Sequence, residues 1–299
     1  MPAAMPMHFW RRPFLALLLA PALTFAAPVG TGVPVAPAKP TRVAKLDVRS
    51  ASVIVLDAVD SSVLYSREAQ RPVPIASITK LMTALVVLDA KQPLDEMIEL
   101  TVADRRLEKS SYSRLAAGSL ISRGDLLHLA LMSSENSAAH AVARTYPGGL
   151  PACLKAMNAK ARALGMKTAR FTDPTGLSSG NVSSAADLAK LVAAAAADAT
   201  IRTFSTSASL TVPVGKQLLE FRNTNSLVTK ADWDVMVQKT GYTNDAGQCL
   251  VMQTVIRERP VLIVLLNSFG KYTRVADARR IRKWMEASAE PGQLAQIAH

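Results

Sequence analysis

The stretch PIASITKLMTALVVLDA, residues 74–90, decides how the chain is organised. Its apolar residues recur every three or four positions, which predicts an amphipathic helix over 77–90. Ser77 begins this helix and Lys80 follows one turn later, so the lysine amine can reach the serine hydroxyl. Lys80 also lies close to the apolar face, where a buried amine is costly unless it has a partner. Ser77 and Lys80 are therefore a candidate nucleophile and base.

The pattern S-x-x-K is weak on its own, because a helix-capping serine beside a surface lysine gives the same letters. Two further motifs strengthen it. Ser134-Glu135-Asn136 is expected at a break between two helices, and Lys239-Thr240-Gly241 near the end of a strand. Three motifs in this order, each on such an element, arise by chance far less often than any one of them.

The pattern of apolar residues along the folded part predicts both strands and helices. A strand hairpin is predicted over 50–68 and a β-like segment over 209–225, with a turn at Gly215. Further strands are predicted over 233–240, 247–258 and 259–269, and further helices over 125–133, 137–145, 150–166, 183–199 and 274–289. Because consecutive strands with short connections pair antiparallel, we predict an antiparallel sheet of about five strands. Helices on both of its faces would give a mixed α/β fold of the α+β kind.

The two ends of the chain have a different character. Residues 1–26 contain two arginines, an apolar run and then small residues, which is typical of a cleaved secretory signal peptide. An uncleaved anchor is the alternative. Residues 27–45 contain four prolines and predict an extended linker. The folded domain is expected over 46–287 and a flexible tail over 288–299.

The charge of the chain is strongly basic, with 35 Lys and Arg against 23 Asp and Glu and a formal net charge of +12. Removal of the signal peptide takes away two arginines and leaves +10. Such a charge suits a polyanionic partner. An exported protein rarely meets nucleic acid, so none is expected. Weak association with an anionic membrane or the cell wall is the alternative to a charge that serves only solubility.

Cysteine and histidine give no sign of a metal site. Cys153 and Cys249 are expected to be two separate buried thiols, although export would permit one disulfide. The four histidines show no paired metal-ligand spacing. We therefore expect neither a metal nor another cofactor.

The three motifs are the set found in penicillin-binding proteins and class A β-lactamases. Longer stretches agree, among them PIASITKLMTALVVLDAKQPLDE, HLALMSSENSAAH and PTGLSSGNVSSAADLAKL. From about residue 46 to 287 the chain resembles the low-molecular-mass penicillin-binding proteins, the serine D,D-peptidases of family S11, and among them the D-alanyl-D-alanine endopeptidases. The resemblance implies a β-lactamase/D,D-peptidase-like fold and a periplasmic location. It implies peptidoglycan stem peptides and β-lactam antibiotics as partners.

The resemblance also implies four catalytic residues. Ser77 would attack the carbonyl of D-alanine and become the acyl-enzyme, while Lys80 takes its proton. Ser134 would relay a proton to the leaving amine. Lys239 would supply positive charge beside it.

Substrate binding is implied for a second group of residues. Asn136 would hold the substrate amide, Thr240 a substrate carboxylate or amide, and Gly241 would leave the strand edge open. The backbone N–H groups of Ser77 and Tyr242 would form the oxyanion hole.

Several neighbouring residues are not assigned to the site. Glu135 is expected to point to solvent, and His128 and His140 to be packed or capped on helices. Asp173 and Asp245 are expected to form turns.

Three alternatives to the endopeptidase remain. A D-alanyl-D-alanine carboxypeptidase would use the same chemistry, but other carboxypeptidases of this group carry a second β domain, and only 58 residues follow Gly241. A class A-like β-lactamase would need a deacylating glutamate, which FTDPTGLSSGNVSS, residues 171–184, lacks. A non-catalytic envelope-binding protein is disfavoured because all three motifs are complete.

Overall fold

The computed structural model describes residues 46–105 and 113–288. The predicted signal peptide and linker lie outside these residues and stay predictions. Of the predicted tail only Ser288 is described, and its hydroxyl donates a hydrogen bond of 2.9 Å to the carbonyl of Trp284. No helix of the described ranges is long and apolar enough to cross a membrane.

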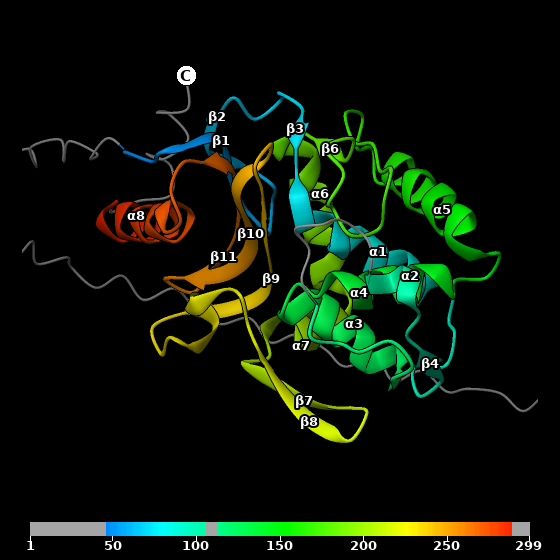
Figure 1. Ribbon diagram of the computed structural model, residues 1–299. Helices are drawn as coiled ribbons and strands as arrows, with labels where there is room; N and C mark the ends of the chain where they lie inside the picture. The colour runs from blue at the N-terminus through cyan, green and yellow to red at the C-terminus, as the bar shows by residue number, and fades with distance from the viewer. Residues whose placement is uncertain (1–45, 106–112, 289–299) are drawn as a thin grey trace, which may run out of the picture. The chain divides into compact units, whose positions relative to one another are not determined.

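An antiparallel sheet of five strands, in the order β2-β1-β11-β10-β9, lies at the centre of the fold (Figure 1). The strands are β1 (Ser50–Asp57), β2 (Val63–Arg67), β9 (Asp234–Thr243), β10 (Gly247–Ile256) and β11 (Arg259–Ser268). The first strand of the chain pairs with the last, from Ser50 opposite Ser268 to Asp57 opposite Val261. The prediction of about five antiparallel strands is therefore confirmed.

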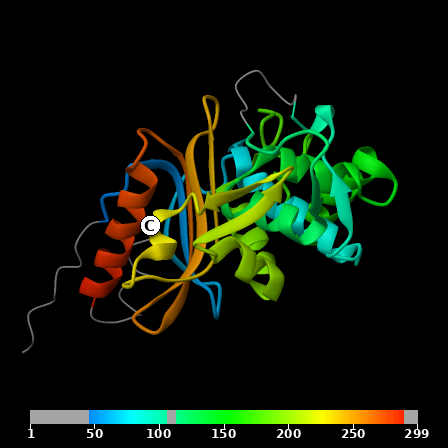
Figure 2. The same ribbon diagram turned by 60° about the horizontal axis from the view of Figure 1, so that its bottom comes forward.

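Helices cover both faces of this sheet, as predicted. One face packs against a block of helices, of which α6 (Ala185–Ala197) touches β1, β9, β10 and β11. The other helices of this block are α1 (Thr79–Asp89), α2 (Val102–Arg105), α3 (Arg123–Met132), α4 (Asn136–Arg144), α5 (Gly149–Ala163) and α7 (Ala199–Thr206). The opposite face is covered by α8 (Thr273–Ala287), which buries Ile281, Trp284 and Met285 (Figure 2). Because both its faces are covered, β11 has an unbroken buried apolar run over 261–266.

Several smaller elements complete the fold. They are the short pairs β3 (Val73–Pro74) with β6 (Val182–Ser183) and β4 (Met97–Glu99) with β5 (Leu120–Ser122), the hairpin of β7 (Ser209–Val214) and β8 (Gln217–Arg222), and the 3-10 turns η1 (Ala76–Ile78) and η2 (Ser226–Thr229). Gly215 forms the turn of the β7–β8 hairpin with a φ of 61°, as predicted.

The structure differs from the predictions in several elements, among them one helix start, one added helix and one strand end. The helix expected from Ser77 begins as η1 and becomes α-helical only at Thr79. Helix α7 was not predicted, and it begins without a loop because Asp198 ends α6 and caps α7 through the N–H of Ile201. Strand β9 continues to Thr243, through residues expected in a turn, because Tyr242 and Gly241 pair with β10.

Candidate active site

The structure brings Ser77, Lys80, Ser134, Asn136 and Lys239 together where η1 meets strand β9. The Nζ of Lys80 lies 2.8 Å from the Oγ of Ser77 and 2.7 Å from the Oδ1 of Asn136. The Nζ of Lys239 lies 2.8 Å from the Oγ of Ser134. The three motifs thus form one polar cluster, contributed by η1 and α1, by the junction of α3 with α4, and by β9.

Lys80 is fully buried, and its amine has three neighbours. Besides Ser77 and Asn136, the carbonyl oxygen of Thr175 lies 2.7 Å from Nζ. Burial lowers the pKa of Lys80 to about 7, although the carboxylates of Asp173 and Glu135 act in the opposite direction. A neutral amine has two N–H donors and one lone pair. The oxygens of Asn136 and Thr175 are acceptors for both donors, which leaves the lone pair for the hydroxyl of Ser77.

The backbone around Ser77 is tightly fitted and exposes this residue. From Ile75 to Val87, Ser77 is the only residue that is not buried. Ala76 has a φ of 47°, in the left-handed region that a residue with a side chain rarely adopts. This turn leaves Ser77 partly accessible to solvent while its neighbours fill the core.

Glycine at 241 lets β9 approach this turn. A Cβ atom there would lie 3.1 Å from the backbone nitrogen of Ser77, the carbonyl oxygen of Ile75 and the Cβ of Ala76. The sequence suggested that Gly241 leaves room for substrate on the strand edge. The structure adds a different reason, which is that a side chain at this position would press on the backbone of Ser77.

Lys239 and Ser134 form the second half of the cluster. Both lysines are fully buried, and burial together with the charges of Lys80 and Arg274 lowers the pKa of Lys239. Lys80 and Lys239 lie in one buried site, so a positive charge on Lys80 makes a positive charge on Lys239 less favourable. Ser134 has a φ of 63°, which turns the chain between α3 and α4.

Thr240 and Tyr242 flank Gly241 in different surroundings. Thr240 is buried, and its Oγ1 lies 2.6 Å from the Oγ1 of Thr224. Tyr242 is exposed, and its hydroxyl donates to the Oδ1 of Asn244 at 3.0 Å. Arg274 of α8 fixes β9 at Gly241, because its Nη1 donates a hydrogen bond of 2.7 Å to the carbonyl oxygen of Gly241.

The loop 172–178 closes the cluster from the other side and is built around Asp173. One carboxylate oxygen of Asp173 accepts from the N–H and Oγ1 of Thr175 at 2.6 Å each and from the N–H of Gly176 at 2.8 Å. The other accepts from the N–H of Ser178 at 3.0 Å. The prediction that Asp173 forms a turn is confirmed, and this turn holds the Thr175 carbonyl against Lys80.

Replacing Asp173 with alanine should loosen this loop and lower the acylation rate of Ser77 about tenfold, because the Thr175 carbonyl would no longer be fixed. Loss of the four hydrogen bonds should also lower the free energy of unfolding by about 1–3 kcal/mol. Penicillin acylation and chemical denaturation measure the two effects. Asp60→Ala removes an exposed turn aspartate that accepts from the N–H of Ser62, and it should change neither. Equal behaviour of the two variants would contradict the assignment.

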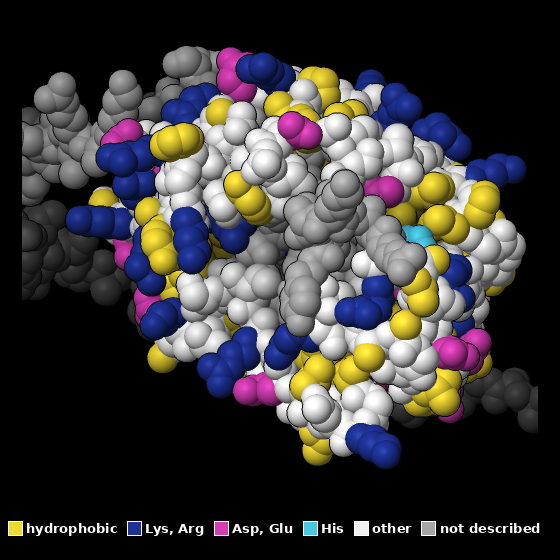
Figure 3. Space-filling view, viewed as in Figure 1, with side chains coloured by type: hydrophobic (Ala, Val, Ile, Leu, Met, Phe, Trp, Pro, Cys, Tyr) yellow, Lys and Arg dark blue, Asp and Glu magenta, His cyan; other side chains and the backbone are white. Residues whose placement is uncertain are grey.

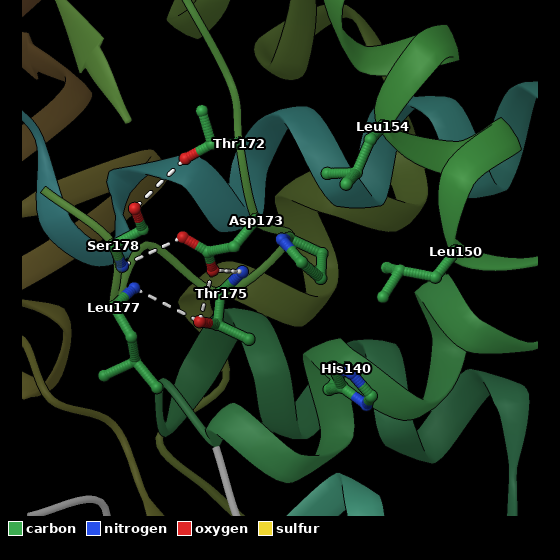
Figure 4. A pocket seen from close by; sticks show the side chains of 9 residues that line it. His140, Leu150, Leu154, Thr172, Asp173, Thr175, Leu177 and Ser178 are labelled. Atoms are coloured by element: carbon green, nitrogen blue, oxygen red, sulfur yellow. Dashed lines mark hydrogen bonds between the residues drawn. The ribbon is translucent and has the colours of Figure 1, made fainter. Parts of the chain in front are cut away.

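A hollow of about 240 Å³ is lined by this loop together with α4 and α5 (Figure 4). His140, Leu150 and Leu154 face it from α4 and α5, opposite Pro174 and Thr175. His140 is one helical turn from Asn136, and its Nδ1 lies 2.7 Å from the buried Asp104. His128 stacks on Phe204 with ring centroids 4.5 Å apart. The expectation that both histidines are packed is confirmed.

The prediction that Glu135 points to solvent is wrong. Its side chain is half-buried and accepts from the N–H of Ser137, so it caps α4. Burial raises its pKa.

Cys153 and Cys249 are separate buried thiols, as expected. Over residues 46–105 and 113–288, no group of three His, Cys, Asp or Glu could hold a metal ion.

Three contacts of the site had no counterpart in the sequence prediction. These are the Thr175 carbonyl on Lys80, the Thr224 hydroxyl on Thr240, and Arg274 on Gly241. The letters DPTG at 173–176 signal a turn and could have indicated the first. The other two join segments 16 and 33 residues apart, and no local pattern marks them.

Comparisons with known proteins agree with this geometry. Residues 39–270 match the family Peptidase S11, described as D-alanyl-D-alanine carboxypeptidase. The chain is 47% identical over 286 residues to a D-alanyl-D-alanine endopeptidase of Pseudomonas aeruginosa, covering 95% of this chain and 88% of that protein. It is 46% identical over 277 residues to a D-alanyl-D-alanine endopeptidase of Escherichia coli, covering 91% and 89%. The crystal structure of a D-alanyl-D-alanine carboxypeptidase from Mycobacterium tuberculosis superposes with a TM-score of 0.76 and 27% identity, covering 85% of this chain and 97% of that one.

Proposed function

The chain belongs to the serine D,D-peptidase family S11, and we propose that it is a D-alanyl-D-alanine endopeptidase, of the penicillin-binding protein 7 type, that hydrolyses peptidoglycan cross-links. The observation that carries this proposal is the buried amine of Lys80, whose lone pair is left for Ser77. The relatives named as endopeptidases support the choice of reaction.

The first half of the reaction forms the acyl-enzyme. Neutral Lys80 accepts the hydroxyl proton as the Oγ of Ser77 attacks the carbonyl carbon of D-alanine. The backbone N–H groups of Ser77 and Tyr242 stabilise the oxyanion, where loss of one donor typically costs about 3–4 kcal/mol. The C–N bond then breaks as Ser134 passes its hydroxyl proton to the leaving amine. Ser134 receives in return the proton that Lys80 took from Ser77, so Lys80 is neutral again. The hydrogen bond of Ser134 with Lys239 at 2.8 Å supports this role.

The second half of the reaction hydrolyses the ester. A water molecule loses a proton to the neutral Lys80 and attacks the acyl carbon. The ester C–O bond then breaks, Lys80 returns the proton to the Oγ of Ser77, and the product leaves with a free carboxyl group on D-alanine. Asn136 and Thr240 bind the substrate amide and carboxylate. A substrate carboxylate near Lys239 would stabilise the charged form of this lysine, which burial disfavours. Strand β9 is an edge strand, so an extended peptide can lie along it.

The cross-linked muropeptide dimer separates the endopeptidase from the carboxypeptidase. Purified protein should convert the dimer to monomers, measured by chromatography of the products. If pentapeptides are trimmed while dimers stay intact, the protein is instead a D-alanyl-D-alanine carboxypeptidase.

Stable acylation by penicillin is expected, in contrast to a β-lactamase. The loop over 171–184 has no glutamate, and all hydrogen bonds of Asp173 described above go to its own loop. No carboxylate of this loop is therefore free to activate a water molecule. Intact-mass spectrometry should show one penicillin on Ser77 that persists for many minutes. Rapid turnover of nitrocefin would overturn this expectation, and Ser77→Ala, which cannot be acylated, is the control.

The location and the partners follow from the same proposal. The protein acts in the periplasm, after export by the signal peptide predicted over 1–26, on peptidoglycan stem peptides. It needs no cofactor and binds no nucleic acid. A non-catalytic envelope-binding protein is the remaining alternative, and the loss of all activity in Ser77→Ala would exclude it.

A further inference from the structure

A groove of about 500 Å³ lies between α8 and η2, outside the cluster described above. Its lining residues are Ser226 of η2 and Tyr272, Val275, Ala276, Arg279 and Arg280 at the beginning of α8. None of these side chains takes part in the proposed reaction, and no acidic residue lines the groove.

Both walls of this groove are attached to the strand that carries Lys239-Thr240-Gly241. On the η2 side, Thr224 lies two residues before Ser226 in the chain. Its Oγ1 lies 2.6 Å from the Oγ1 of Thr240. On the α8 side, the Nη1 of Arg274 donates to the carbonyls of Gly241 at 2.7 Å and Cys249 at 3.1 Å. Because β9 is an edge strand, an extended ligand can lie along it, and both walls are tied to this strand at Thr240 and Gly241.

The charge of the groove is positive. Arg279 is exposed and has no ion-pair partner among the residues that the structure describes. Arg280 donates 2.6 Å to Asp277, a buried carboxylate that also accepts from the N–H groups of Arg49 and Ser50. Lys271 is exposed, with its Nζ 5.6 Å from the centroid of the Tyr272 ring, and Figure 3 shows Lys and Arg side chains gathered on the side of the molecule where α8 lies.

Exposed aromatic side chains border the same end of the sheet. In the described part of the chain, the large aromatic residues that are exposed are Tyr242 at 57%, Phe269 at 95% and Tyr272 at 74%. Tyr242 of β9 pairs with Gln248 of β10, which pairs with Ser268 of β11. Phe269 is the next residue after Ser268, so it lies at the same end of the sheet as Tyr242. Exposed aromatic side chains that gather at one end of a sheet are suited to contact with a partner.

We propose that this groove binds the peptidoglycan strand beyond the scissile cross-link. The inference rests on the proposed function and extends it to a polymeric substrate. Arg279 and Arg280 bind carboxylates of neighbouring stem peptides, and Tyr272 offers a flat apolar face with a polar edge to the peptide or the sugar. A groove joined to the substrate strand fits a linear anionic polymer. A bilayer is flat and would touch the protruding Phe269 more readily than the interior of the groove.

Binding and cleavage of intact sacculi test the proposal. Arg279→Glu and Tyr272→Ala are each made in the full chain, with Lys155→Glu on α5 and Leu218→Ala on the β7–β8 hairpin as controls of matched charge and exposure. We expect each groove variant to cleave sacculi about tenfold more slowly and to cleave a soluble muropeptide dimer at the wild-type rate. For Arg279→Glu this is the loss of one charge-assisted contact, and for Tyr272→Ala the loss of one stacking contact. The controls should match the wild type on both substrates.

Co-sedimentation with sacculi gives a readout that does not depend on activity. In a Ser77→Ala background, Arg279→Glu should reduce the bound fraction, whereas Lys155→Glu should not. If the wild type cleaves no dimer but Arg279→Glu still binds sacculi less than Lys155→Glu does, the proposed function is wrong while the groove remains a binding site for peptidoglycan. Equal losses on sacculi and on the dimer, or no loss on sacculi, would overturn the groove. So would reduced binding to phosphatidylglycerol vesicles with sacculi unaffected, since the partner would then be a membrane.

Discussion

Lys80→Arg should slow the acylation of Ser77 by penicillin about 10³-fold, because arginine stays protonated and cannot act as a base. The arginine keeps a long hydrogen-bonding side chain at the same position but has no lone pair that could accept the proton. Stopped-flow or mass-spectrometric acylation rates measure it. Lys155→Arg, at an exposed position of α5, should leave the rate unchanged.

The pH profile gives the same hypothesis a second measurement. Since the pKa of Lys80 is lowered to about 7 by burial, the amine is neutral above this pH and protonated below it. The acylation rate should therefore be level above about pH 7 and fall about tenfold per pH unit below it. An acylation rate that does not change between pH 5 and 9, or an Arg variant that retains most of the rate, would show that Lys80 is not the base.

The lowered pKa also has a cost in stability, and its sign follows from proton counting. Between about pH 7 and the ordinary lysine value of 10.5, the unfolded chain holds a proton that the folded protein does not. The free energy of unfolding should therefore rise with pH across this window as far as Lys80 is concerned. Below pH 7 the full cost of burying the lysine is present. The site thus gives up stability to obtain a base that works near neutral pH.

The sequence predicted those parts of the site that local spacing determines. Ser77 and Lys80 are three residues apart on one helix, so their contact follows from helical geometry. Ser134 and Lys239 were assigned only by resemblance, because nothing local says that they lie within 2.8 Å of each other. The antiparallel sheet and the closing helix were predictable from alternation and amphipathic periodicity, which depend on neighbours along the chain.

What the sequence did not predict lies mainly in the backbone. Ala76 and Ser134 have positive φ angles of 47° and 63°, although neither is glycine or asparagine, the usual residues in that region. Tertiary contacts impose these conformations. The Thr175 carbonyl that fixes Lys80 is also a backbone group, which every residue has, so no letter marks it. Glu135, which lies between the motif residues Ser134 and Asn136, was predicted to point to solvent. Its half-buried side chain instead caps α4 through the N–H of Ser137.

Gly176→Ala should destabilise the protein and disable the site together. Gly176 has a φ of 86°, and a Cβ atom there would lie 1.9 Å from the carbonyl oxygen of Ala76 and 2.8 Å from the backbone nitrogen of Ser77. These are rigid backbone atoms, so the loop 172–178 or the turn of Ser77 must move. We expect a loss of about 2–4 kcal/mol in the free energy of unfolding, from positive φ and overpacking together. The acylation rate should fall about 100-fold, because a shift of about 1 Å separates reacting groups.

Gly118→Ala separates the two causes of this loss. Gly118 has a nearly equal φ of 81°, but a Cβ atom there would have no neighbour within 4 Å. It should therefore lose only the conformational part, about 1–2 kcal/mol, and keep its acylation rate. Urea denaturation and penicillin acylation compare the two variants. Equal destabilisation with acylation preserved in both would mean that the contact of Gly176 with Ala76 and Ser77 does not hold the nucleophile. A loss of acylation confined to Gly176→Ala would instead tie the position of Ser77 to the loop that also fixes Lys80.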